Sequence, residues 1–228
     1  MKKEAVIELS QRIIPGKENF KLEIKIDDIA KTLPHTAHRA DVWYILGEVS
    51  YCTHVSTHIE APYHHLKEGL DIADYPVHRL IGNCVVMDFS TKKGDEAITL
   101  EEVKKYDTLI HQNDIVFIRN GMDQYFRSER WMEMSYLTEE ATHWLIDQGI
   151  ACLGTDAAGL EIPGTDFQPN HTALFKANIP VIESLTNLEK IENGKYLVFI
   201  LPLAVEGLDA SPVRVVAIRK EALRDELS

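Results

Sequence analysis

The sequence predicts an α/β fold whose strands share one sheet within a single domain. Apolar runs rich in β-branched and aromatic residues recur along the 228-residue chain, and segments with helix-capping signals lie between them. The chain is 45% hydrophobic, long enough to form one well-packed core, and it has no Pro-, Gly- or Ser-rich linker that would divide it. We therefore expect residues 1–228 to form one domain.

The strands are expected where short apolar runs are enriched in Val, Ile, Phe and Tyr, because these side chains pack well on a pleated surface. In chain order these runs are Ala5–Leu9, Val42–Val49, Cys84–Phe89, Ile115–Arg119, Ile150–Leu153, Tyr196–Pro202 and Val213–Ile218. We expect all of them to belong to the shared sheet.

Two helices are predicted from their boundary residues. Thr99 and Glu102 have the spacing of a capping box in front of residues 103–106. Thr138 can cap a second helix over residues 139–147, and Gly149 follows at the position where a left-handed residue ends a helix.

The segment with the clearest chemistry lies between Tyr51 and His65, where polar side chains occupy even-numbered positions. They are His54, Ser56, His58, Glu60 and His64. An extended backbone would direct all of them to the same side. The β-branched residues between them favour a strand, and the proline that follows Glu60 by two positions would end regular pairing.

A helix is the rival prediction for this segment. It would stack His54 over His58 one turn apart but turn Glu60 to the opposite side, so only a strand brings the three groups together. Two imidazoles and one carboxylate leave open positions on a divalent metal, as catalysis requires. The residues alone leave a second interpretation open, because two of ten histidines that lie four apart can also be surface or core residues.

Residues 54–64 read His-Val-Ser-Thr-His-Ile-Glu-Ala-Pro-Tyr-His. They resemble the signature H-x-G-T-H-x-D-x-P-x-H of the cyclase family of metal-dependent hydrolases, which includes bacterial kynurenine formamidases and isatin hydrolases. Weaker family features follow in order along nearly the whole chain: Val6–Ser10, Asp114–Gly121, Gly154–Asp156, His171 and Ile182–Leu185. The resemblance implies a mixed β-sheet in an α/β domain of the swivelling β/β/α type.

The resemblance also implies the metal ligands, which are His54, His58, Glu60, His171 and Glu183. The first three would bind one metal, and Glu60 could bridge to a second metal held by the other two. Taken without the family, His171 could equally begin a helix and Glu183 could be a surface carboxylate. The predicted cofactor is therefore a divalent metal, Zn or Mn, with one or two ions per chain.

The last motif residue, His64, resembles the general acid/base of the family, although by itself it could also cap a turn. Two positions depart from the signature. Glu60 replaces Asp and reaches further from the strand by one methylene, which bears on the number and identity of the metal ions. Ser56 replaces Gly, which makes a positive φ harder to adopt and adds a hydroxyl that can hydrogen-bond a ligand or bound water.

The predicted function is hydrolysis of an amide bond by metal-activated water. The substrate would be an aryl formamide such as N-formylkynurenine or a cyclic amide such as isatin. The alternatives are a lactone hydrolase, a cyclase or dehydratase that uses the same metal site, and a metal-binding protein without catalytic activity.

Bulk properties predict a cytoplasmic enzyme that acts on a small molecule. The formal net charge of −12 argues against nucleic-acid binding, and no stretch is apolar enough for a membrane span. The three cysteines form no C-x-x-C pair, and the first residues lack the apolar core of a secretory signal. The family resemblance adds a homodimer or larger homo-oligomer.

Overall fold

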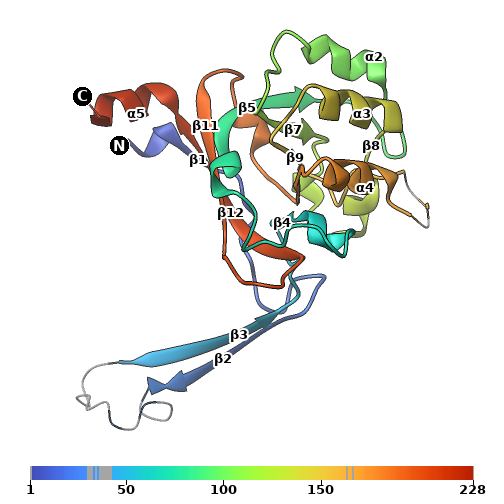
Figure 1. Cartoon of the computed structure of the whole chain (residues 1–228). Coiled ribbons are helices and arrows are strands. Elements are labelled where there is room, and N and C mark those ends of the chain that lie inside the picture. Colours follow the sequence, from blue (N-terminus) through green and yellow to red (C-terminus); the bar gives the residue numbers. More distant parts are fainter. Residues whose placement is uncertain are drawn as a thin grey trace.

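A mixed sheet that closes on itself forms the body of the protein (Figure 1). The structure is a computed structural model and describes residues 2–29, 33, 35, 43–162, 164–165 and 167–227. The strands follow one another around the ring in the order β12-β11-β5-β7-β9-β10-β4, and β4 pairs again with β12 to close it. β1 is added to the outer edge of β12.

The strands of this sheet are β1 (Val6–Glu8), β4 (His58–Glu60), β5 (Ile81–Asp88), β7 (Ile115–Arg119), β9 (Cys152–Thr155), β10 (Val181–Glu183), β11 (Tyr196–Pro202) and β12 (Ala210–Arg219). Its central strands β5, β7, β9 and β10 run parallel, whereas β1, β4 and β11 pair antiparallel with their neighbours. The two short strands β6 (Ala97–Ile98) and β8 (Tyr136–Leu137) form a separate parallel pair.

Alternation along the central strands divides the buried residues into two cores. In β5, Cys84 and Val86 belong to the core enclosed by the ring, whereas Val85 and Met87 belong to the core outside it. The same division holds around the ring, because successive side chains of a strand point to opposite faces. A strand buried on both faces reads as a continuous apolar run, which is why β5, β7 and β9 could be predicted from sequence. The three-residue strand β10 was not predicted.

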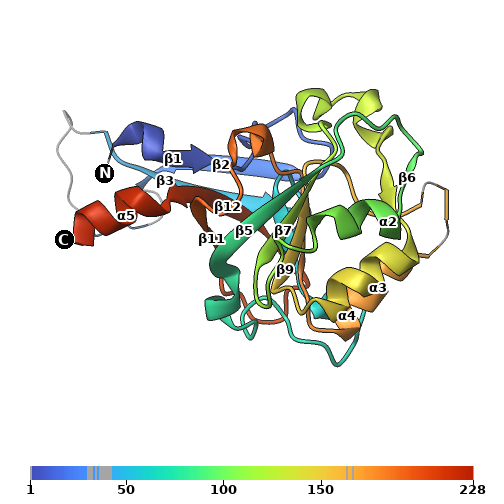
Figure 2. The ribbon, with the colours of Figure 1, turned by 90° about the horizontal axis from the view of Figure 1, so that it is seen from above.

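The helices are α2 (Leu100–Val103), α3 (Glu139–Asp147), α4 (Pro169–Lys176) and α5 (Lys220–Leu227). The first three gather on one side of the ring, and α5 lies at the other end of the molecule (Figures 1 and 2). α3 and α4 pack on the outer face of the parallel strands through fully buried side chains such as Leu145 and Leu174. Among the described residues, no helix has the length and hydrophobicity needed to cross a membrane.

A long hairpin projects from the ring (Figure 1). It consists of β2 (Leu22–Asp28) and β3 (Ile45–Tyr51), which pair only with each other in the described chain. The prediction that the run Val42–Val49 joins the shared sheet is therefore wrong, and Val42 itself lies outside the described residues. The run has strand character, but its composition does not determine which strand it pairs with.

The prediction of an α/β fold with one mixed sheet is confirmed. Each of the other predicted runs overlaps a strand of the sheet, in some cases with shifted bounds. Both predicted helices form. The Thr138 hydroxyl accepts a hydrogen bond from the Ala141 amide at 3.2 Å, and Gly149 follows α3 with φ +70°. The sequence did not reveal β2 or α4, and β10 contributes to the sheet with only three residues.

The tight packing of β9 against β7 generates a stability prediction. A Cβ on Gly154 would lie 2.8 Å from Phe117 Cδ1 and 2.9 Å from Leu185 Cδ1, and both of these side chains are completely buried. We expect Gly154→Ala to lower the free energy of unfolding by about 1–3 kcal/mol, because the side chains of Phe117 and Leu185 must shift to make room for the added methyl group. Urea denaturation measures this change.

Gly82→Ala in β5 is the matched control, because its Cβ would have its nearest neighbour at an ordinary 3.5 Å. An equal loss of stability in both variants would contradict the prediction, because Gly→Ala without a close contact removes only unfolded-state flexibility and should not destabilise the fold.

Candidate metal centre

The strand β4 carries two of the predicted ligands, and its pairing brings in a third. His58 and Glu60 lie two residues apart on the same face of β4, as an extended backbone requires. β10 pairs antiparallel with β4 and places Glu183 directly opposite His58. His58 Nε2 lies 3.3 Å from Glu60 Oε1 and 3.7 Å from Glu183 Oε2.

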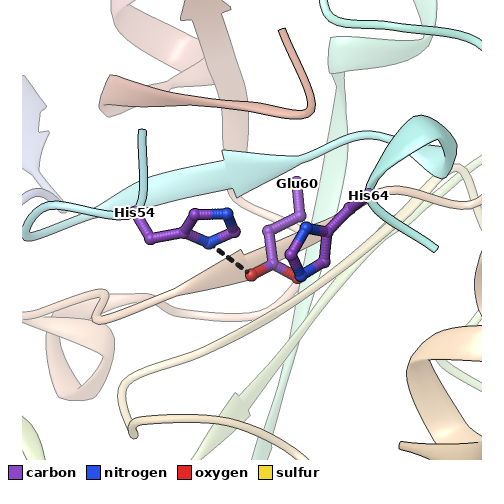
Figure 3. A group of neighbouring side chains, drawn as sticks. All are labelled: His54, Glu60 and His64. Atoms are coloured by element: carbon purple, nitrogen blue, oxygen red, sulfur yellow. Dashed lines mark hydrogen bonds and ion pairs between the residues drawn. The ribbon is translucent and has the colours of Figure 1, made fainter. Parts of the chain in front are cut away.

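His54 reaches the same point from outside the strand. The predicted strand is too long, because β4 begins only at His58 and residues 53–57 form turns and bends. The backbone bends at Ser56, which has φ +60°. His54 Nδ1 nevertheless lies 2.9 Å from Glu60 Oε1, and the two side chains meet in front of β4 (Figure 3).

His171 comes from the first turn of α4, more than a hundred residues further along the chain. Its Nε2 lies 3.3 Å from Glu183 Oε1 and 3.5 Å from Glu60 Oε2. Glu60 is thus within reach of three histidine rings, and all five predicted metal ligands come together around it.

In each of these three histidines, the ring nitrogen that points away from Glu60 and Glu183 faces a hydrogen-bond acceptor. His58 Nδ1 lies 2.9 Å from the Ser56 carbonyl, His171 Nδ1 lies 2.7 Å from Glu161 Oε1, and His54 Nε2 lies 3.0 Å from Asp209 Oδ2. Each acceptor fixes a proton on the nitrogen that faces it and leaves the other nitrogen toward the centre. Metal-binding histidines have this arrangement.

The charges of the cluster favour a cation. Burial lowers the pKa of His171, but hydrogen bonds with Glu161 and Glu183 outweigh it and raise the pKa to about 10. Burial likewise lowers the pKa of His54, yet bonds with Glu60 and Asp209 raise it to about 9. Without a metal, these imidazoles would hold protons at neutral pH, and a divalent ion would displace them on binding.

The residues present fit a divalent metal. Glu60 Oε2 is buried and has no hydrogen-bond partner, which is costly for a carboxylate oxygen unless a cation faces it. Two overlapping groups have potential ligand atoms within 4.8 Å of one another: His54, Glu60 and His64, and His58, Glu60 and Glu183. Imidazole nitrogens with carboxylate oxygens suit a metal such as Zn or Mn.

His64 lies at the edge of this cluster. It belongs to the short 3₁₀-helix Pro62–His64, which begins as soon as β4 ends, and its ring centroid lies 4.5 Å from that of His54 (Figure 3). His64 Nδ1 lies 2.8 Å from Asp209 Oδ2. His64 therefore shares a carboxylate with a predicted ligand.

Two carboxylates that contact the histidines from outside the cluster, Asp209 and Glu161, were not predicted from sequence. We call them the outer carboxylates. Asp209 lies just before β12, and its Oδ2 contacts both His54 and His64. Burial raises the pKa of Asp209, but its hydrogen bonds with these two histidines dominate and lower it to about 2. Glu161 accepts from the backbone amides of Asn170 and His171 in addition to the His171 ring. An acid in a loop has no periodic signal that could have singled it out.

Ser56 adopts the positive φ that glycine adopts more easily. The bend places its carbonyl against His58 Nδ1, so the backbone of this residue orients a predicted ligand. Its hydroxyl is buried without a hydrogen-bond partner. The sequence prediction that this hydroxyl bonds a ligand or water stays a prediction.

Comparisons with known proteins agree in family and fold. A family model described as "Putative cyclase" matches residues 7–162. Kynurenine formamidase from Erythrobacter litoralis is 26% identical over 172 residues, which cover 75% of this chain and 76% of the relative. The solved structure of isatin hydrolase A from Ralstonia solanacearum has a TM-score of 0.79 at 20% identity and covers 94% and 92% of the two chains.

A further solved structure, described as a potential metal-dependent hydrolase with cyclase activity, has a TM-score of 0.73 at 24% identity. The match covers 94% of this chain and 98% of that one. At these identities the solved structures show a shared fold, which confirms the predicted fold class.

The outer carboxylates generate a prediction about metal affinity. Glu161→Gln keeps the size of the side chain but removes the charge beside His171 Nδ1. We expect it to weaken binding of Zn or Mn by about 10- to 100-fold, the usual effect of losing a partner of a metal-binding histidine. Competition with a chromogenic chelator measures the affinity.

Glu101→Gln, on the exposed first turn of α2, is the control for the loss of one negative charge. Equal affinities in the Glu161 and Glu101 variants would contradict the assignment of His171 as a ligand.

Proposed function

This chain belongs to the cyclase family, and on that premise we propose that it is a metal-dependent hydrolase that cleaves C–N bonds other than peptide bonds. The observation that carries the proposal is the environment of Glu60. One of its oxygens is buried without a hydrogen-bond partner. Three histidines surround the carboxylate, and the other ring nitrogen of each one faces a hydrogen-bond acceptor. This arrangement supports a catalytic metal.

The substrate we propose is an aryl formamide such as N-formylkynurenine or a cyclic amide such as isatin. The relatives named kynurenine formamidase and isatin hydrolase support these two classes. In both classes, a carbonyl carbon bound to nitrogen is attacked by water. A single set of groups at the metal site could therefore serve either substrate.

When bound, the metal would supply a water of lowered pKa and polarise the carbonyl under attack. The chain's own residues have two further tasks. The Ser56 carbonyl, Glu161 and Asp209 orient the ligand imidazoles, so that little reorganisation is needed when the substrate arrives. His64 holds a proton that can pass to the leaving nitrogen.

His64 suits this acid/base role because it is both positioned and accessible. Asp209 holds its Nδ1, which leaves Nε2 to exchange a proton with the substrate. The His64 side chain is 27% exposed, whereas that of His58 is 3% exposed. A proton can therefore move between His64 and the solvent, which repeated turnover requires.

The site supports one or two metal ions. Glu60 Oε1 lies near His54 and His58, and Glu60 Oε2 lies near His171, so the predicted ligands could hold one ion or two. We propose Zn or Mn as the ion, which His54, His58, Glu60, His171 and Glu183 would hold.

The runner-up is a lactone hydrolase, or a cyclase or dehydratase that activates a carbonyl with the same site. The solved structure described as having cyclase activity supports it. A metal-binding protein without catalysis is the third candidate. The position of His64 beside Asp209 argues against it, because metal storage requires no acid/base group. We further propose that the protein is cytoplasmic and acts as a homodimer or larger homo-oligomer.

A panel assay tests the proposed reaction. Protein stripped of metal with a chelator should be inactive on N-formylkynurenine, isatin and a set of small lactones. Turnover of an amide should return on addition of Zn or Mn. Tight metal binding with turnover of lactones alone would favour the runner-up, and tight binding with no turnover of any compound would contradict hydrolysis of these classes.

Substitutions separate the acid/base group from the ligands. We expect His64→Ala to retain metal and to lower kcat by about 100- to 10,000-fold, the usual contribution of a positioned acid/base. His58→Ala should lose both metal and turnover. His143→Ala, at an exposed position of α3, serves as the control. Normal kcat in His64→Ala would remove this residue from the mechanism.

A further inference from the structure

His65 follows the 3₁₀-helix Pro62–His64 and contacts α4, which lies beside this short helix (Figure 1). Its Nε2 lies 2.9 Å from Gln168 Oε1, and its Nδ1 lies 3.0 Å from Thr172 Oγ1. Gln168 is the residue just before α4, and Thr172 belongs to its first turn. In the described chain, the side-chain hydrogen bonds that join the 3₁₀-helix to α4 both come from His65.

The two partners of His65 lie on either side of His171 in the chain. Gln168 and Thr172 are four residues apart, and the Thr172 amide donates to the Gln168 carbonyl at 3.0 Å. Side chains with this spacing lie on the same side of a helix, so one imidazole can reach both of them. The turn that His65 spans is therefore the turn that carries the predicted metal ligand His171.

The hydrogen bonds of His65 differ from those of the predicted ligands. Each of the three predicted histidine ligands keeps one ring nitrogen toward Glu60. In His65 both nitrogens are engaged, because Nε2 donates to the side-chain oxygen of Gln168 and Nδ1 accepts from the Thr172 hydroxyl. A neutral imidazole satisfies both contacts and leaves no nitrogen for a metal. The arrangement suits a residue that binds α4.

The ring of His65 lies between the predicted acid/base group and a predicted ligand. Its centroid lies 4.9 Å from that of His64 and 5.8 Å from that of His171. It also makes a T-shaped contact with Phe175 of α4, with the centroids 5.2 Å apart. Phe175 is completely buried, so it offers the ring a fixed surface. Packing and hydrogen bonds together define one orientation of His65.

We propose that His65 is a positioning residue, which holds the first turn of α4 against the 3₁₀-helix and so sets the position of His171 relative to His64. This inference rests on the proposed function of the site. An acid/base group and a metal ligand must keep one relative position for the reaction to proceed, and a displacement of about 1 Å can cost about 100-fold in rate. The two residues come from distant segments, so a contact between those segments must fix that position.

Substitutions at both ends of these hydrogen bonds test the proposal. His65→Phe keeps a ring against Phe175 but removes both hydrogen bonds. His65→Asn places an amide near the position of Nδ1, and His65→Gln places one near the position of Nε2, so each variant can restore one bond. Thr172→Val removes one bond from the side of α4. His78→Phe is the control, because it makes the same substitution at an exposed position.

We expect His65→Phe to weaken binding of Zn²⁺ by about 10-fold, since two hydrogen bonds that place α4 are lost. Competition with a chromogenic chelator measures this affinity. The visible absorption of bound Co²⁺, which depends on coordination geometry, should shift as well. On an amide that the wild type cleaves, kcat should fall by about 10- to 100-fold with little change in KM.

The other variants should follow from the bonds they keep. His65→Asn and His65→Gln should bind Zn²⁺ with affinities between those of the wild type and His65→Phe. Thr172→Val should weaken binding by about 3-fold, the effect of one hydrogen bond, and should add little to His65→Phe. Circular dichroism checks that each variant is folded. Thr172→Val provides the same test if His65→Phe does not fold.

Wild-type Zn²⁺ affinity or an unchanged Co²⁺ spectrum in folded His65→Phe would overturn the proposal. An equal loss of affinity in His78→Phe, or in both His65→Asn and His65→Gln, would also overturn it. The metal measurements need no turnover, so they separate this inference from the proposed reaction. A wild type that binds metal but cleaves no amide would contradict the proposed function alone, whereas one that binds neither Zn²⁺ nor Co²⁺ would contradict both.

Discussion

The pairing of β4 with two neighbours is the constraint on which the rest of the structure depends. This strand has only three residues, yet it hydrogen-bonds to β10 on one side and to β12 on the other and so closes the ring. The same pairing sets the register of the metal centre, because it places Glu183 of β10 opposite His58. The pairing that closes the sheet therefore also brings these two ligands together.

The cluster around Glu60 carries an electrostatic cost that the protein must balance. Buried carboxylates are unfavourable unless protons, hydrogen bonds or a cation neutralise them. In this chain the Ser56 carbonyl, Glu161 and Asp209 orient the three imidazoles. The raised pKa values of His54 and His171 show how strongly the neighbouring carboxylates attract positive charge. The same arrangement that would destabilise a metal-free core gives the centre its affinity for a divalent ion.

Much of the fold could be predicted because the central strands are buried on both faces. The run Ile115–Arg119 is apolar except for its last residue, and the predicted bounds are those of β7. The hairpin of β2 and β3 shows the limit of this reasoning. Ile45–Tyr51 has strand character, but among the described residues it pairs with β2 alone. Local composition specifies that a segment is extended, whereas its partner depends on contacts between segments far apart in the chain.

The sequence by itself determined the chemistry of the motif. Spacing and residue type predicted a strand that carries His58 and Glu60 on one face, because that relation depends only on the two-residue period of an extended backbone. Tertiary structure decided the rest of the centre. The bend at Ser56 brings in His54, the start of α4 brings in His171, and the loop before β12 brings in Asp209. These positions depend on sheet register and on packing between distant segments, which no local pattern of residues encodes.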